Sequence, residues 1–195
     1  ALAQKDLKKL VAYSSVNHMG YTLLGMSAII AASGMNGSNL ISAQAGVGGA
    51  VFQMFNHGTI SAMLFILVGV IYDRAHHRDI EGFGGLASQM PIYTAFVALA
   101  FFAGLGLPGF SGFVSEAMIF IGAFPVFRTI VIISTLGILL NAAYFLWAFQ
   151  RMFFGPANEK YNDLPEINSR ELFTVIPLAV ITVYLGVYPR PFLDL

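Results

Sequence analysis

The stretch GLGLPGFSGFVSEAMIF, residues 104–120, combines an interrupted backbone with a charge in an otherwise apolar run. Its Glu116 is the only acidic residue between Glu81 and Glu159. A charge inside a membrane is costly enough to mark a functional site by default, so we expect Glu116 to exchange a proton or hold a cation. The alternatives are an ion pair that only fixes helix packing, or a helix end that places Glu116 at the membrane interface.

The same stretch predicts a helix break. Pro108 removes a backbone donor, and the glycines Gly104, Gly106, Gly109 and Gly112 allow non-helical geometry. Irregular backbone at membrane depth is tolerated where it is buried in protein or lines a cavity. Discontinuous helices of this kind bind and pass ions in transporters, which makes the break and Glu116 one candidate site.

The composition is that of a membrane protein. Of 195 residues, 57% are hydrophobic and 10% are charged, whereas soluble domains carry about 25% charged residues. Ten basic and ten acidic residues balance, which argues against nucleic acid as a partner. The absence of cysteine excludes disulfides, thiolate zinc sites and cysteine-held iron–sulfur clusters. The sequence starts without methionine in a charged, loop-like stretch that does not read as a signal peptide, so we expect a fragment of a longer protein.

Apolar stretches long enough to cross a bilayer predict an all-α, polytopic transmembrane helix bundle in one membrane domain, 1–195. The expected spans are residues 11–33, 44–72, 91–124, 129–153 and 171–189. The third would be about 51 Å long as one straight helix, against a hydrocarbon core of about 30 Å, so it must be a broken, tilted crossing or a hairpin. The positive-inside rule modestly favours one crossing, with eight basic residues in the cytoplasm. These eight are Lys5, Lys8, Lys9, Arg74, Arg78, Arg151, Lys160 and Arg170, against Arg128 and Arg190 outside.

Polar residues recur at helical spacing on three expected spans, each on one helix face. They are Ser14, His18 and Thr22 in the first span, Gln53, His57 and Ser61 in the second, and Ser134 and Asn141 in the fourth. Hydroxyls in membrane helices often only bond their own backbone. His18 and His57 are ionisable groups inside the expected spans, which favours a proton relay over a packing role.

The remaining ionisable residues have simpler interpretations. His76 and His77 are adjacent in a charged loop, which is a poor spacing for metal ligation, and we expect both to be solvated. Lys5, Lys8 and Lys9 have the character of a cytoplasmic anchor. We find no nucleophile–base pair, metal-ligand spacing or phosphate loop in the sequence that would indicate an ordinary enzyme.

Three long motifs carry a family resemblance. AQKDLKKLVAYSSVNHMGY, GAVFQMFNHGTISAMLFILVGVIYDRAHHRDIEGFGGL and LGLPGFSGFVSEAMIF follow one another as in the antiporter-like membrane subunits of respiratory complex I. The match covers the whole chain and resembles the NuoM type, which corresponds to mitochondrial subunit four. The resemblance implies the last five helices, ten to fourteen, of a fourteen-helix fold, with the broken span as helix twelve. It also implies that Glu116, His18 and His57 belong to the central hydrophilic axis, and that the axis lysines lie upstream of this chain.

The resemblance implies a proton-translocating subunit of NADH:quinone oxidoreductase that supplies the distal half-channel and has no redox centre of its own. FMN, iron–sulfur clusters and quinone are expected on other subunits, and paralogous membrane subunits and the lipid bilayer as partners. The expected location is a bacterial inner membrane, or else an organellar energy-transducing membrane. The alternatives are a subunit of a multisubunit Na⁺/H⁺ antiporter or a membrane-bound hydrogenase, and a scaffold that transports nothing.

Overall fold

The computed structural model describes residues 1–34, 37–161 and 164–194 as a bundle of helices, and no strand occurs among these residues. The long helices are α1 (Leu7–Ala32), α2 (Gly37–Ala75), α4 (Pro91–Gly104), α5 (Ser111–Ala123), α6 (Arg128–Phe153) and α7 (Ser169–Val187). The short ones are η1 (Ile80–Gly82), α3 (Leu86–Gln89), η2 (Glu159–Tyr161) and α8 (Arg190–Leu193). Parts of two expected loops, residues 35–36 and 162–163, lie outside the described residues.

Each expected span coincides with one helix, or in the third case with two. Within the described part of the chain, α2, α6 and α7 are long and apolar enough to cross a membrane. Helix α1 has 26 residues but does not meet the same hydropathy criterion. Polar side chains along the helix, among them Ser14, Asn17 and His18, lower its mean hydropathy.

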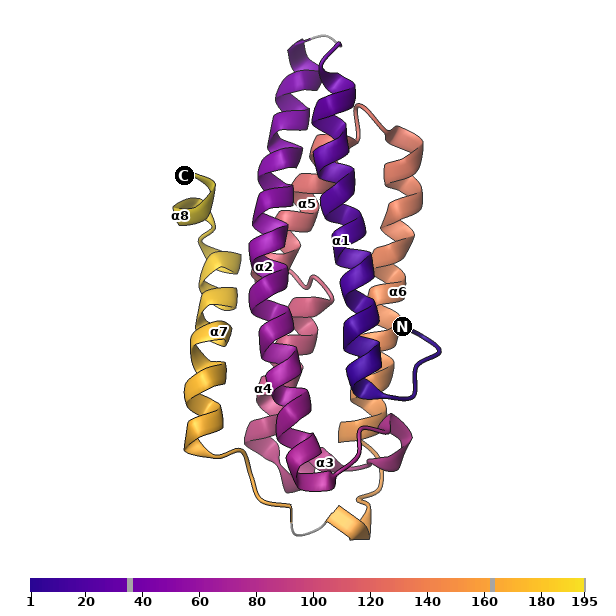
Figure 1. Ribbon diagram of the computed structural model, residues 1–195, viewed down its shortest axis with the longest axis vertical. Coiled ribbons are helices and arrows are strands. Elements are labelled where there is room, and N and C mark those ends of the chain that lie inside the picture. Colours follow the sequence, from indigo (N-terminus) through magenta and orange to yellow (C-terminus); the bar gives the residue numbers. More distant parts are fainter. Residues whose placement is uncertain (35–36, 162–163, 195) are drawn as a thin grey trace.

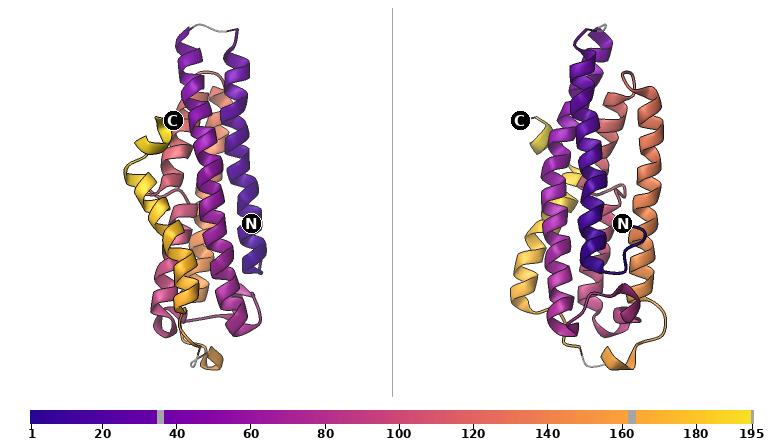
Figure 2. Two further views of the ribbon diagram at one scale, coloured as in Figure 1. Left: turned by 60° about the vertical axis from the view of Figure 1, so that its left-hand side comes forward. Right: turned by 45° about the vertical axis from the view of Figure 1, so that its right-hand side comes forward.

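The third span is a broken single crossing. Helices α4 and α5 lie one above the other along α2, so the chain continues in one direction through the interruption (Figure 1). Turning the molecule leaves them in one column (Figure 2). The hairpin alternative is therefore wrong. The interruption covers residues 105–110, where Gly106 and Gly109 have φ angles of 76° and 102°. Gly104 and Gly112 were expected in the break but lie inside the helices that flank it.

The helices α1, α2 and α5 form the tightly packed centre of the bundle. At the closest approach, a Cβ on Gly122 of α5 would lie 2.4 Å from the backbone nitrogen of Gly46 on α2. Only glycine allows two helix backbones to come this close, which is how membrane helices gain packing contact without a hydrophobic driving force. This packing holds the upper half of the broken span against α2, and with it Glu116.

Charged contacts tie the loops together at the end of the bundle where α1 and α7 begin. Arg78 reaches Asp6 at 3.4 Å, and the backbone of residues 5–7 bonds to the backbone at Arg78 and Ile80. Arg74 donates to both carboxylate oxygens of Glu171 at 2.8 Å. Segments that the positive-inside rule assigned to one side of the membrane thus meet at one end of the fold.

His77 is half-buried and packed against neighbouring residues, whereas we expected it to be solvated; His76 is exposed, as expected. The His77 ring stacks on Phe83 with centroids 4.3 Å apart, and its Nε2 is hydrogen-bonded to the Tyr161 hydroxyl. The Nδ1 atom accepts a hydrogen bond from the Asp79 backbone at 3.2 Å. The charged loop folds back on itself through these contacts, which the sequence spacing alone could not indicate.

This packing predicts that the loop is less stable at acidic pH. Burial, together with the positive Lys160, lowers the pKa of His77, while Asp79 opposes the shift. Between the lowered pKa and the usual value of about 6.5, the opened loop binds more protons than the closed loop, so closure weakens as pH falls through this window. Hydrogen exchange of residues 76–84 in the purified full-length protein should accelerate from pH 7.5 to pH 5.5, beyond the intrinsic pH dependence of exchange. His77→Gln should remove this effect and His76→Gln should keep it; an effect that persists in His77→Gln would contradict the assignment.

Candidate functional site

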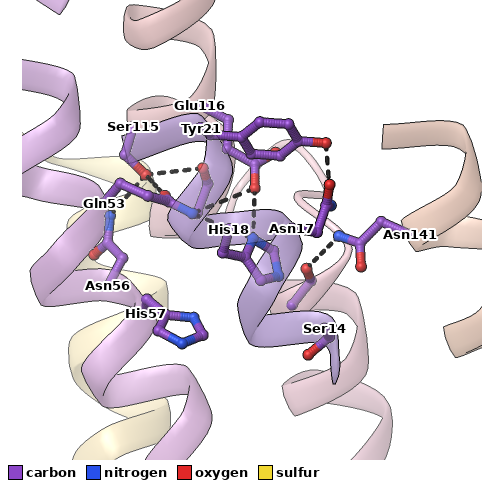
Figure 3. A network of polar contacts seen from close by, with 12 residues as sticks. Ser14, Asn17, His18, Tyr21, Gln53, Asn56, His57, Ser115, Glu116 and Asn141 are labelled. Atoms are coloured by element: carbon purple, nitrogen blue, oxygen red, sulfur yellow. Dashed lines mark hydrogen bonds and ion pairs between the residues drawn. The ribbon is translucent and has the colours of Figure 1, made fainter. Parts of the chain in front are cut away.

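The Glu116 carboxylate is buried at the centre of the bundle and lies beside a histidine. Glu116 is 4% exposed on α5, and its Oε1 lies 3.1 Å from Nδ1 of His18 on α1 (Figure 3). Two deprotonated atoms of this kind would both be acceptors, so a contact this short requires a proton between them. The structure therefore brings together His18 and Glu116, two sequence-predicted residues 98 positions apart, as one pair that shares a proton.

Gln53 of α2 completes the first ring of contacts around this pair. Its Nε2 donates to Oε1 of Glu116 at 3.4 Å and lies 3.3 Å from Nδ1 of His18. The Gln53 Oε1 accepts a hydrogen bond from the Ser115 hydroxyl, which in turn accepts one from Asn56 Nδ2 at 3.0 Å. Both Gln53 and Asn56 are buried, so this chain of hydrogen bonds fixes the orientation of the Gln53 amide toward the carboxylate.

The helix break and the carboxylate are in direct contact. A Cβ on Gly106 would lie 2.8 Å from Oε2 of Glu116, so the left-handed turn at this glycine passes against the carboxylate. On the other side of the break, Asn141 of α6 donates to the carbonyl oxygen of Gly104 at 2.9 Å. Asn141 in turn accepts a hydrogen bond from the Tyr144 hydroxyl. A carbonyl at the end of α4 is thereby paired by a side chain of a neighbouring helix.

His57 lies next to this pair but outside its direct hydrogen bonds. Its ring centroid is 5.4 Å from that of His18, and its ring nitrogens are within 3.3 Å of the Ser61 hydroxyl. His57 and Ser61 are half-buried, whereas His18 is buried. The three ionisable groups are thus arranged in the order Glu116, His18, His57, from the interior of the bundle toward a more accessible face of α2.

The other predicted polar residues divide into two groups. Ser14 and Thr22 are buried, but their hydroxyls donate to backbone oxygens of their own helix, at Val11 and His18. Ser134 is half-buried on α6 and takes no part in the hydrogen bonds that connect Glu116 to its neighbours. From the polar stripes, Gln53 and His18 make hydrogen bonds at the site and Asn141 makes one at the break, while the His57 ring lies beside that of His18.

Sequence reasoning missed Asn56, Ser115 and the aromatic residues that line the site. Asn56 follows Gln53 by three positions, which places both side chains on the same face of α2. That spacing is the sequence signal that could have identified Asn56. Tyr21 of α1 accepts a hydrogen bond from Asn17 at 3.1 Å, and its ring lies edge-on 6.3 Å from His18. No group of three or more His, Cys, Asp or Glu side chains that could hold a metal ion occurs among the described residues. What the arrangement offers chemically is a proton shared between a carboxylate and an imidazole.

Comparison with known proteins identifies the family. The profile of the family described as NADH:quinone oxidoreductase/Mrp antiporter, transmembrane, matches residues 1–141. The chain is 45% identical to NADH-quinone oxidoreductase subunit M of Rhodobacter capsulatus over all of its own length and 36% of that protein. It is 40% identical to F420H2 dehydrogenase subunit M of Methanosarcina mazei, again over all of its length and 37% of that protein.

A solved structure shares the fold. A chain of respiratory complex I from Thermus thermophilus with bound NADH superposes with a TM-score of 0.84 at 28% identity, covering 98% of this chain and 38% of that one. The chain thus spans somewhat more than a third of the length of the relatives it matches. The apolar helices and the family together make it a membrane protein. The chain belongs to the transmembrane family of NADH:quinone oxidoreductase and Mrp antiporter subunits, in the branch that includes subunit M of complex I.

Proposed function

We propose that the chain is part of a proton-translocating membrane subunit of a complex I-type NADH:quinone oxidoreductase. The observation that carries this proposal is the buried Glu116–His18 pair against the broken helix. A carboxylate and an imidazole that share one proton can take up a second and release it again, and the turn at Gly106 brings irregular backbone to the same point. Glu116, His18 and His57 would then be successive stations for a proton.

The protein would work only within a larger assembly. We infer that the rest of the protein supplies the other ionisable groups of the proton path, since this chain covers 36% of its relative in Rhodobacter capsulatus. FMN, iron–sulfur clusters and quinone would sit on other subunits, which would drive the proton path by redox chemistry elsewhere in the complex. Paralogous antiporter-like subunits would be its neighbours, and a bacterial inner membrane its location.

A second candidate differs only in the electron donor. The relative in Methanosarcina mazei, at 40% identity, is named as a subunit of an F420H2 dehydrogenase. A multisubunit Na⁺/H⁺ antiporter would use the same fold without a donor. Co-purification of the full-length protein from its native membrane separates these candidates, because NADH-oxidising, F420H2-oxidising or no redox subunits would accompany it.

The transported ion is tested with the purified parent complex in sealed proteoliposomes. Addition of the electron donor should acidify the lumen in sodium-free buffer, and the rate should not change when Na⁺ is added. The same preparation should take up no more ²²Na⁺ than an uncoupled control. Donor-driven ²²Na⁺ uptake without direct acidification would overturn the proposal in favour of sodium transport. Quinone reduction without proton or sodium flux would favour the alternative that the subunit is a scaffold that transports no ion.

A further inference from the structure

A cavity lies at the end of α6, away from the Glu116 site. It has a volume of about 620 Å³ and opens between the last turns of α6, the loop after it and the segment that follows η1. Its lining includes both charges and aromatic rings. The residues that matter to the argument are Glu81, Phe83, Trp147, Gln150, Arg151 and Phe154. This volume is in the range of small-molecule sites, which are about 300–1,000 Å³.

The cavity presents one positive and one negative group that have no ionic partner in the described chain. The ion pairs among the described residues join His18 to Glu116, Arg74 to Glu171 and Arg78 to Asp6, so Arg151 and Glu81 are in none of them. The Arg151 guanidinium lies 5.8 Å from the centroid of the Trp147 ring. A ligand that carries both an anionic and a cationic group would satisfy both side chains at once.

The position of the cavity on α6 points to the membrane. Trp147 and Arg151 lie one turn apart near the end of an apolar helix, where tryptophan and basic residues meet lipid headgroups. From there an exposed apolar stripe follows α6 through Ala143, Leu139 and Leu136 at helical spacing. A ligand with a charged head in the cavity would therefore have its tail on this stripe, which a soluble metabolite would leave empty.

We propose that this cavity binds the headgroup of a zwitterionic aminophospholipid of the phosphatidylethanolamine class. Arg151 and Gln150 would hold the phosphate, Glu81 would hold the ammonium, and the acyl chains would follow the exposed stripe of α6. A purely anionic headgroup has no ammonium group to pair with the Glu81 carboxylate and would be repelled by it. Glu81 therefore sets the preference for an amine-bearing lipid. The site is independent of the proton-sharing pair, and its test does not depend on the direction or kind of ion transport.

The test uses the purified parent complex in nanodiscs with photoactivatable lipids of identical acyl chains. One probe carries the phosphatidylethanolamine headgroup and the other carries phosphatidylglycerol, and mass spectrometry measures the labelling of the peptide that covers residues 132–147. In the native complex we expect labelling by the ethanolamine probe to exceed that by the glycerol probe about threefold, the effect of one exposed charge pair. Glu81→Gln should bring the two probes to equal labelling, and Arg151→Gln should lower labelling by both.

Arg128→Gln is the matched control, because Arg128 is an exposed arginine at the opposite end of α6, stacked on Phe124. It should leave the probe ratio at residues 132–147 unchanged, and retained quinone reduction shows that each variant complex is assembled. Equal labelling by both probes in the native complex would mean ordinary bilayer lipid and would overturn the proposal. A preference that survives Glu81→Gln would overturn the role of the carboxylate, and with it the assigned headgroup.

Discussion

Replacing Glu116 with glutamine is expected to lower proton translocation by the parent complex at least about tenfold, a bound below the roughly 10²–10⁴-fold that one acid–base group typically contributes. Glutamine has nearly the same shape and can keep hydrogen bonds to His18 and Gln53, but it cannot release a proton. The buried contacts around the site are otherwise preserved, so the helix packing should survive. The loss would then come from the missing titratable group and not from a misfolded subunit.

The measurement is donor-driven acidification of proteoliposomes, with quinone reduction measured in parallel in the presence of an uncoupler. Asp73→Asn is the matched control, since Asp73 is an exposed carboxylate on α2 beyond the site, and it should pump at the native rate. Glu116→Asp keeps the titratable group but withdraws it from His18, so it should fall between the two. Native pumping by Glu116→Gln would remove Glu116 from the proton path.

The sequence was sufficient to locate the site because its signals are local in the chain. A carboxylate without an acidic neighbour for 34 residues on either side, in an apolar run next to Gly106, Pro108 and Gly109, predicts both the break and the buried charge. The polar stripes on α1 and α2 likewise placed His18 and Gln53 on faces that could meet. Each of these inferences needs only helical spacing and the cost of a polar group in the membrane.

The contacts between helices could not be predicted in the same way. Whether His18 or His57 touches Glu116 depends on how α1 and α2 rotate and slide against α5, and that is set by close backbone packing such as Gly46 on Gly122. The same limit explains the error at His77, where stacking on Phe83 and the bond to Tyr161 join segments separated in the sequence. Spacing assigns a residue to a face but does not determine the residue opposite.

The second large prediction concerns the helix break, which contains two glycines of similar backbone conformation. They differ in whether an added Cβ would meet the Glu116 carboxylate. Gly106 and Gly109 both adopt left-handed φ angles, so alanine at either position costs roughly 1–2 kcal/mol of backbone strain. A Cβ on Gly109 has no atom within 4 Å, whereas a Cβ on Gly106 would lie 2.8 Å from Oε2 of Glu116. Gly106→Ala therefore has to displace the Glu116 carboxylate, and Gly109→Ala does not.

Gly106→Ala is accordingly expected to lower proton pumping several-fold, because a displaced carboxylate lengthens the 3.1 Å contact through which Glu116 and His18 share a proton. Gly109→Ala should lower the thermal stability of the purified protein about as much as Gly106→Ala does, but the Gly109→Ala protein should pump at close to the native rate. Comparing pumping per quinone reduced in the two variants cancels the strain that they have in common. If both variants pump equally, the turn at Gly106 serves only to interrupt the helix; if they differ as expected, the helix break also positions the Glu116 carboxylate.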